Sequence, residues 1–310
     1  IPLADPSVFR HGIYLQQDGS NSGHLIKNNI IARSASHGIQ MRNGGTIYNN
    51  LFTFNSIGFL LGGGDAGKSG GVEVDAYGNV IMHGKNLDGS NARGWGITAE
   101  NISVGRVSGN IIANRISGTF PISFEASSST YPVYDLEFDN NIIYNWGQGP
   151  EFDGPSTSYT SVKIRNNQIS DTGNYLLEIG TASLTGKITS SNNRFNSATI
   201  PSGQIIEIAA VDYTIDQYKT RVNDTTSYTG ADTFLDPERT IASYDAYIGR
   251  AGTFDSFISG ARQQSRANFN PAFTAAAANS YFRDGFNLDD PAFEVKLNNT
   301  TNSIFTTSSR

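Results

Sequence analysis

The chain has 310 residues, enough for one large domain or two small ones with a sizeable buried core. Hydrophobic residues make up only 37% of it, 33 residues are Gly and none is Cys, which favours a turn-rich β protein and excludes disulfides and thiolate metal sites. A net charge of −6 and a pI near 5.2 argue against a general nucleic-acid-binding protein. No apolar stretch is long enough to span a membrane.

The first residues, IPLADPSVFRHGIYLQ, contain neither the basic region nor the apolar region of a signal peptide. A strand-like segment, HGIYL, already begins at residue 11. We therefore expect that the chain is processed from, or cut out of, something longer. A missing N-terminal segment or a second chain is accordingly a candidate partner.

One short phrase returns along the chain, with an Asn in its third position and an apolar residue in its fifth. Its copies are KNNII at 27, YNNLF at 48, YGNVI at 77, SGNII at 108, DNNII at 139, RNNQI at 165 and SNNRF at 191. The third-position residues are Asn29, Asn50, Asn79, Asn110, Asn141, Asn167 and Asn193, and the steps between them run from 21 to 31 residues. A second phrase recurs once in each of the first five repeat units: HGIYL at 11, HGIQM at 37, IGFLL at 57, WGITA at 95 and FPISF at 120. Such periods are typical of stacked structural repeats.

Each unit holds short segments of alternating apolar residues broken by Asn, Gly and Ser, which are typical of strands of a few residues. Units of this length without a helix predict an all-β, right-handed parallel β-helix over residues 1–210, whose coils stack at the spacing of strands in a sheet. Asn tolerates the left-handed backbone of a tight corner, and stacked Asn side chains can bond to one another. A leucine-rich repeat would need a regular Leu pattern, and a propeller would need longer units.

Two long steps indicate loops at 64–71 and 82–95, and insertions in solenoids often build a binding face. Residues 211–310 form a C-terminal extension in which the repeat decays. Thr253 is a candidate helix N-cap before Phe254, Phe257, Ile258 and Ala261, and a second helix is expected after Pro271, with Gly285 as a candidate C-cap. These helices are expected either to cap the end of the solenoid or to lie along one face.

The Asn-Asn-Ile corners, together with HGIYL and HGIQM, resemble bacterial right-handed parallel β-helix repeat proteins of the pectate-lyase-like superfamily, over residues 8 to about 210. The segment AAAANSYFRDGF is similar to a tail found after such repeats. The resemblance implies a fold and a set of activities on carbohydrates: polysaccharide lyases, C5-epimerases, glycoside hydrolases and phage tailspikes. The epimerases carry Asp-Pro-His-Asp, whereas this chain has ADPSVFRHG with Ser7 in place of the His, which weakens that alternative.

His11 and His37 lie one coil apart in the same HGI context, so we expect them to be close neighbours. Tyr14 and Arg42 should share their neighbourhood. Elimination from a uronate needs a cation that neutralises the carboxylate, a base that removes the C5 proton and an acid that assists the leaving oxygen. These four residues supply those groups and are the predicted catalytic set. A His at a coil corner can also simply bond the backbone of the next coil.

Further residues are predicted to bind substrate, and the two insertions are expected to bring the later ones, with His83, over the same end. The set is Arg10, Gln16, Gln40, Lys68, Lys85, Arg93 and Trp95. The first 100 residues are less acidic than the rest, which favours an anionic polysaccharide there. Ca²⁺ is the alternative neutralising cation, although no cluster of carboxylate ligands for it can be assigned from the sequence.

A glycoside hydrolase would instead need two neighbouring carboxylates, and we expect Glu100 and Glu125 to stack in consecutive coils. Asp65, Asp75, Asp88 and Asp153 are further carboxylate candidates. Trp95 and Trp146 could form exposed sugar platforms. The remaining alternative is a β-helix that binds glycan without catalysis, as tailspikes do. For each alternative, a secreted or cell-surface location is expected.

Overall fold

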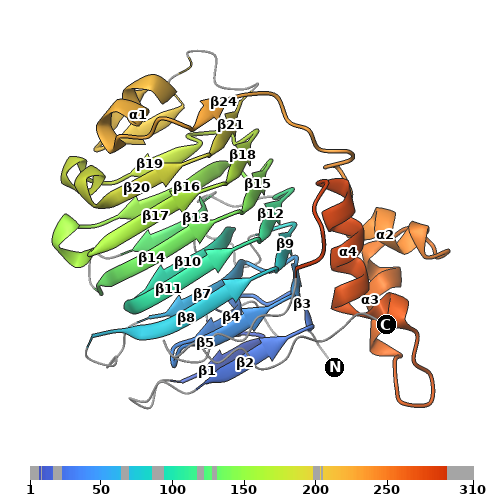
Figure 1. Cartoon of the computed structure of the whole chain (residues 1–310). Coiled ribbons are helices and arrows are strands. Elements are labelled where there is room, and N and C mark those ends of the chain that lie inside the picture. The colour runs from blue at the N-terminus through green and yellow to red at the C-terminus, as the bar shows by residue number, and fades with distance from the viewer. Residues whose placement is uncertain are drawn as a thin grey trace.

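The computed structural model describes residues 7, 9–16, 23–63, 70–85, 94–116, 122–127, 131–197, 203 and 205–291. The predicted right-handed parallel β-helix is confirmed: each coil gives one strand to each of three sheets, from β1–β2–β3 to β19–β20–β21 (Figure 1). Within the described residues, no helix is both long and apolar enough to cross a bilayer.

The three sheets run along the whole solenoid, and neighbouring strands are parallel except for β22 and β23. Sheet 1 contains β1 (Ile13–Leu15), β4 (His37–Met41), β7 (Ile57–Gly62), β10 (Trp95–Glu100), β13 (Ile122–Ser127), β16 (Gln148–Asp153), β19 (Leu177–Ile179), β22 (Ile206–Ile208) and β23 (Val211–Tyr213). Sheet 2 contains β2 (His24–Lys27), β5 (Gly45–Tyr48), β8 (Val72–Tyr77), β11 (Ile102–Ser108), β14 (Val133–Asp139), β17 (Ser161–Arg165) and β20 (Ile188–Ser191). Sheet 3 contains β3 (Ile30–Ala32), β6 (Leu51–Thr53), β9 (Val80–Met82), β12 (Ile111–Ala113), β15 (Ile142–Tyr144), β18 (Gln168–Ser170), β21 (Arg194–Asn196) and β24 (Tyr228–Thr229).

The recurring Asn residues form a ladder through the corner between sheets 2 and 3. From Asn29 to Asn167, each side-chain amide donates to the Oδ1 of the next Asn, ending at Asn193, at 2.9–3.1 Å. The backbone N–H of the same residue donates to that oxygen as well. The predicted Asn stacking is therefore confirmed, and it satisfies polar groups that would otherwise be buried without partners.

The residue before each ladder Asn has a separate task. It has the left-handed backbone, with φ of 60° at Asn28, 55° at Asn140 and 66° at Gly78. Asn and Gly are the residues that adopt this conformation at low cost. The repeated Asn-Asn or Gly-Asn pair thus combines one residue that turns the chain with one that bonds along the stack.

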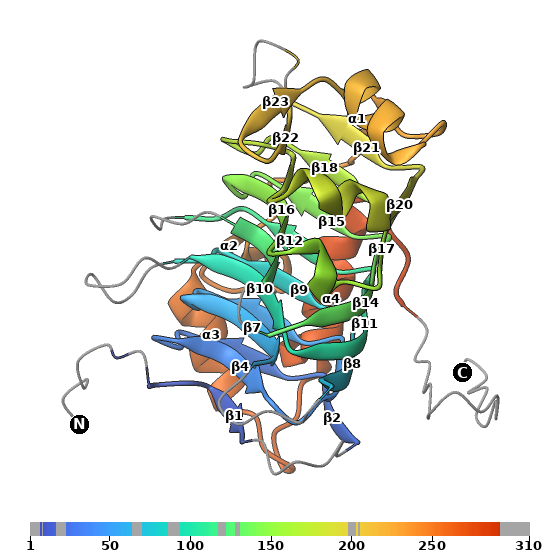
Figure 2. The same cartoon turned by 90° about the vertical axis from the view of Figure 1, so that its left-hand side faces the viewer.

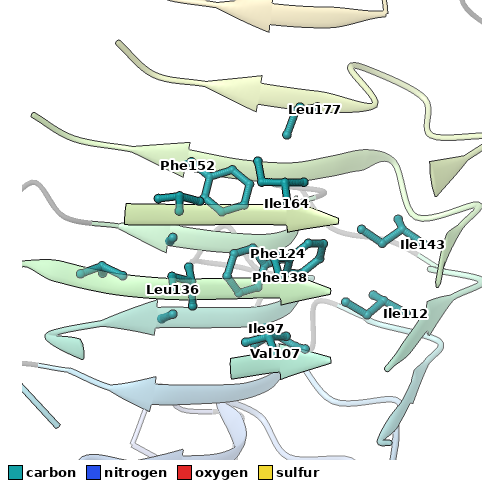
Figure 3. Close-up of a cluster of buried hydrophobic side chains, with 14 of the residues drawn as sticks. Ile97, Val107, Ile112, Phe124, Leu136, Phe138, Ile143, Phe152, Ile164 and Leu177 are labelled. Carbon is teal, nitrogen blue, oxygen red and sulfur yellow. The ribbon is translucent and has the colours of Figure 1, made fainter. Parts of the chain in front are cut away.

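Apolar side chains from all three sheets meet inside the solenoid, as Figure 3 shows for Ile97, Val107 and Ile112 of one coil. In the next coil, the rings of Phe124 and Phe138 lie 4.6 Å apart, centroid to centroid. The interior is therefore a stack of similar layers, each of which covers the one below it.

The Gly of the HGI phrase is required by this interior. At Gly38 an added Cβ would lie 2.5 Å from the carbonyl oxygen of Gly58 and 2.9 Å from Cδ1 of Phe52. The Phe52 side chain comes from sheet 3 and fills the space beside Gly38. The second repeated phrase thus marks the corner where sheet 3 side chains pack against the start of sheet 1.

Within the described part of the chain, four α-helices follow the last coils (Figures 1 and 2). They are α1 (Ile215–Val222), α2 (Ile241–Tyr247), α3 (Phe254–Arg262) and α4 (Ala275–Gly285), with short 3₁₀ turns η1 (Ser156–Ser158), η2 (Ala182–Lys187) and η3 (Pro271–Phe273). Thr253 caps α3 as predicted, accepting a bond from the backbone N–H of Ser256. The expectation for Gly285 is wrong: it is the last helical residue, and the left-handed residue is Asn287.

The two predicted helices, α3 and α4, lie along one face, and the end of the solenoid is covered by α1, a helix that was not predicted from the sequence. Helix α1 covers the C-terminal end of the solenoid, where its Tyr218 packs edge-on against Phe195. Helices α2, α3 and α4 lie along the outer face of sheet 3 (Figure 1), where Phe257 and Phe282 join Val80 and Ile111 in one buried cluster. The helices therefore cover sheet 3, whereas the predicted catalytic histidines lie at sheet 1.

Candidate functional site

His11 lies just before β1 and His37 begins β4, so that parallel pairing places one above the other. Their Nδ1 atoms are 3.3 Å apart and their ring centroids 5.2 Å apart. The predicted proximity of the two histidines is confirmed. Ser36 lies beside them, with its Oγ 3.1 Å from His37 Nδ1.

Tyr14 and Arg42 join the two histidines. The Tyr14 ring is stacked on His11 at 5.1 Å with an interplanar angle of 17°, and it remains 44% exposed. The Arg42 guanidinium lies 5.6 Å from the centre of the Tyr14 ring on its face. The Tyr14 hydroxyl donates to Oε1 of Gln16. The four residues predicted to be catalytic therefore form one continuous contact group at the edge of sheet 1.

Gln40 connects the cation to the imidazole pair. It is in register with Tyr14 and almost fully buried. With its amide oxygen toward Arg42, that oxygen accepts from Nε at 3.2 Å and Nη2 at 3.0 Å, while the amide nitrogen donates to His11 Nε2 at 3.2 Å. We call His11, Tyr14, His37, Gln40 and Arg42 the histidine cluster.

The other described residues predicted to bind substrate lie outside the histidine cluster. Arg10 is exposed and adjoins the cluster, because its carbonyl oxygen accepts from the backbone N–H of Ser36 at 3.1 Å. Trp95 is half-buried at the start of β10, two rungs from His37 in the same register. Lys85 is half-buried and its backbone N–H donates to the Asn55 carbonyl oxygen. Lys68 and Arg93, with Asp65 and Asp88, lie outside the described residues.

Two aromatic predictions are wrong. His83 does not reach the cluster: it is buried beside Thr53 and Phe54, which in turn contacts Phe254 of α3. Burial lowers the pKa of this imidazole to about 4. Trp146 forms no exposed platform, because it is fully buried and its indole N–H donates to the Ile122 carbonyl oxygen at 3.1 Å.

One column of side chains runs along the outer face of sheet 1. Alternate residues of each strand point into the core, so the residues between them face outward. In register, this outer column contains Tyr14, Gln40, Leu60, Thr98, Glu125, Glu151, Glu178 and Glu207. The buried Leu60 and Thr98 rungs separate the histidine cluster from four consecutive glutamates.

The expected stacking of Glu100 on Glu125 is wrong. Glu125 pairs with Thr98 in one neighbouring strand and with Glu151 in the other, and Glu100 lies two residues further along β10. The glutamate column was missed because FEA, PEF, LEI and IEI look like separate strand fragments. Their common signal is a Glu between core residues at coil-length spacing. Asp75, another carboxylate candidate, is paired with Arg106 on sheet 2 at 2.7 Å.

The glutamate column has unusual acidity. Burial is the largest cause and neighbouring acidic groups add to it, so that the pKa of Glu125 and that of Glu151 each rise to about 7. The pKa of Glu178 rises to about 8 for the same reasons. The Gln148 amide donates to Oε2 of Glu178 at 2.7 Å and to Oε2 of Glu151 at 3.3 Å. Near neutral pH, such carboxyl groups can either donate or accept a proton.

No group of three or more His, Asp or Glu side chains in the described part of the chain is arranged to hold a metal ion, so no residue is assigned to Ca²⁺. A scan against protein-family models, a search of the curated proteins and a search of the solved structures each find no match to this chain. The geometry of the outer column is therefore the basis for assigning a function.

Proposed function

We propose that the protein is a polysaccharide lyase of the pectate-lyase-like type, which cleaves a uronate-containing chain by β-elimination at the histidine cluster. The observation that supports this most strongly is the contact group itself. An exposed Tyr14 stacks on His11, and His11 is bridged through Gln40 to Arg42. The sheet 1 face on which the cluster lies is long, which suits an extended polymer.

In the proposed reaction, Arg42 and the Gln40 amide bind the C5 carboxylate and stabilise the charge that develops on it. The His11–His37 pair removes the C5 proton. The electron pair of that C–H bond forms the C4–C5 double bond as the bond from C4 to the glycosidic oxygen breaks. The Tyr14 hydroxyl gives its proton to the leaving oxygen, and the proton held by the imidazole pair then restores the phenol.

The test is incubation of the full chain with polygalacturonate, alginate, chondroitin sulfate and neutral glycans. Elimination produces an unsaturated uronate, which absorbs in the ultraviolet, together with a new reducing end. His11→Ala, His37→Ala and Tyr14→Phe should each lower the rate by roughly 10²-fold or more, since general acid–base groups contribute that much. The matched control is His24→Ala, on β2 of sheet 2. Full activity in any of the three cluster variants removes that residue from the mechanism.

A glycoside hydrolase is the second candidate, favoured by the raised pKa values of the glutamate column. Glu125 and Glu151 are in register in adjacent strands, about 5 Å apart, which is close to the carboxyl separation of retaining glycosidases. New reducing ends from neutral glycans without ultraviolet absorbance, lost in Glu151→Gln but kept in Glu73→Gln on sheet 2, would establish hydrolysis and reject elimination.

The third candidate is a secreted or surface-displayed β-helix that binds polysaccharide without cleaving it. It would be supported if no glycan yields either product while calorimetry detects binding of a polyuronate. The secreted or cell-surface location is itself proposed, because it brings the sheet 1 face to extracellular polymers. Its test is whether the native protein is found outside the cell or in the soluble lysate.

A further inference from the structure

The hydrogen bonds of the histidine cluster determine where its protons lie. The Gln40 amide nitrogen is a donor, so the His11 Nε2 that faces it carries no proton. In a neutral imidazole the proton is then on His11 Nδ1, which donates to His37 Nδ1 at 3.3 Å. His37 Nδ1 is therefore an acceptor as well, and its proton is on Nε2.

In this arrangement both imidazole lone pairs are occupied. The lone pair of His11 Nε2 accepts a hydrogen bond from the Gln40 amide, and the lone pair of His37 Nδ1 accepts one from His11 Nδ1. Ser36 Oγ also lies close to His37 Nδ1. A proton added at either nitrogen would place two donors face to face. The pair can act as a base only after one of these hydrogen bonds is broken.

The bond most open to competition is that of Gln40, because its amide depends on Arg42 for its orientation. The Gln40 oxygen accepts from Nε and Nη2 of Arg42, the two donors that a carboxylate binds as a pair. Charge-assisted bonds are roughly twice as strong as neutral ones, so a carboxylate should displace the amide oxygen. Gln40 would then turn, donate its N–H to the carboxylate and leave His11 Nε2.

We propose that Gln40 couples carboxylate binding at Arg42 to the release of His11 Nε2 as the base. In the free protein the base is masked, and the substrate's own carboxylate unmasks it. Gln40 is thus a positioning residue that acts through His11. This inference rests on the proposed lyase function, but its chemical content is recognition of a single sugar carboxylate, which can be tested without turnover.

The groups around the imidazole pair make the experiment interpretable. Among the described residues, the titratable or charged groups near the imidazole pair include Tyr14 of β1, which stacks on His11, and Arg42 just after β4, whose guanidinium lies over the Tyr14 ring. Arg10 precedes His11 in the chain and is exposed. The next strand, β7, places Ile57 in register with His37, and the Ile57 side chain has no group that titrates. Leucine fits the fold at position 40, because Leu60 occupies the same place in the next coil.

The experiment uses the full chain labelled with ¹⁵N, in which NMR reads the tautomer and pKa of both imidazoles. Galacturonate is the carboxylate probe and galactose the neutral control. The free protein should show His11 protonated on Nδ1, and galacturonate should raise the pKa of the pair by about one unit or more. Gln40→Leu should have the higher pKa without ligand and a smaller response, and Gln40→Glu should move the His11 proton to Nε2. Galactose should change nothing.

The inference is overturned if free His11 carries its proton on Nε2, if galactose acts like galacturonate, or if Gln40→Leu titrates like the wild type. In the lyase assay, Gln40→Leu should lower kcat/KM roughly tenfold or more, since one contact to the carboxylate is lost both in the bound substrate and in the transition state. A purely structural role would lower the free energy of unfolding and leave the tautomer and pKa of the imidazole pair unchanged. If the NMR results are as expected but no polyuronate is cleaved, the coupling through Gln40 is supported and the proposed lyase function is rejected.

Discussion

Replacing Glu125 by Gln tests the electrostatics of the glutamate column most directly. Glu125 lies between Thr98 and Glu151 in register, with its carboxyl in a half-buried, acidic surrounding. Its pKa rises from 4.5 to about 7, first through burial and then through Glu100 and other acidic neighbours. Gln keeps the size and hydrogen-bonding capacity of the side chain but cannot ionise.

The sign follows from proton linkage. Because the pKa of Glu125 is higher in the folded state, the folded chain binds more protons than the unfolded chain between pH 4.5 and about 7. The contribution to the free energy of unfolding is full below pH 4.5 and is lost as the pH rises through about 7. At about 1.4 kcal/mol per pKa unit this is roughly 3 kcal/mol, which solvent screening and sharing of protons along the column reduce to roughly 2 kcal/mol.

The assay is urea unfolding followed by circular dichroism at pH 4 and pH 8.5. Glu125→Gln should be roughly 2 kcal/mol more stable than the wild type at pH 8.5 and equal to it within about 0.5 kcal/mol at pH 4. Glu73→Gln, at an exposed position of sheet 2, is the matched control and should show no such difference. A wild-type stability that does not fall between the two pH values, or a Gln variant destabilised equally at both, would refute the reasoning.

Two further predictions concern what holds the fold together. Asn110→Ala removes the oxygen that accepts from the backbone N–H and the side-chain amide of Asn79, and two hydrogen bonds that Asn110 donates. Urea unfolding should therefore show a loss of about 3 kcal/mol in the free energy of unfolding. Asn140→Gly, at the exposed left-handed position, should cost less than about 1 kcal/mol, and equal losses would contradict the separate tasks of the two residues. Arg283→Met removes a guanidinium that donates to the Gly78 carbonyl oxygen at 2.6 Å, so hydrogen exchange in α4 should speed up by at least tenfold while the ladder amides keep their protection. Unchanged exchange in α4 would show that this contact does not hold the helix to sheet 3.

The sequence by itself determined the architecture, because a parallel β-helix converts distance along the chain into height along one axis. A residue that recurs once per coil must lie above its counterpart, so the Asn ladder and the closeness of His11 and His37 followed from spacing alone. Inward and outward positions could be read wherever apolar and polar residues alternate.

Only the tertiary structure decided the features that depend on where each strand starts within its coil. Coil lengths differ, so Glu100 and Glu125 fall two residues out of register and the continuous column begins at Glu125 instead. The segments of sheet 3, such as VIM at 80, are apolar on both faces, and spacing could not show that their outer side is covered by α2–α4. The hydrogen bonds by which Gln40 connects Arg42 to His11 likewise could not be predicted from the sequence, since they depend on the Gln40 amide oxygen facing Arg42 and its nitrogen facing His11.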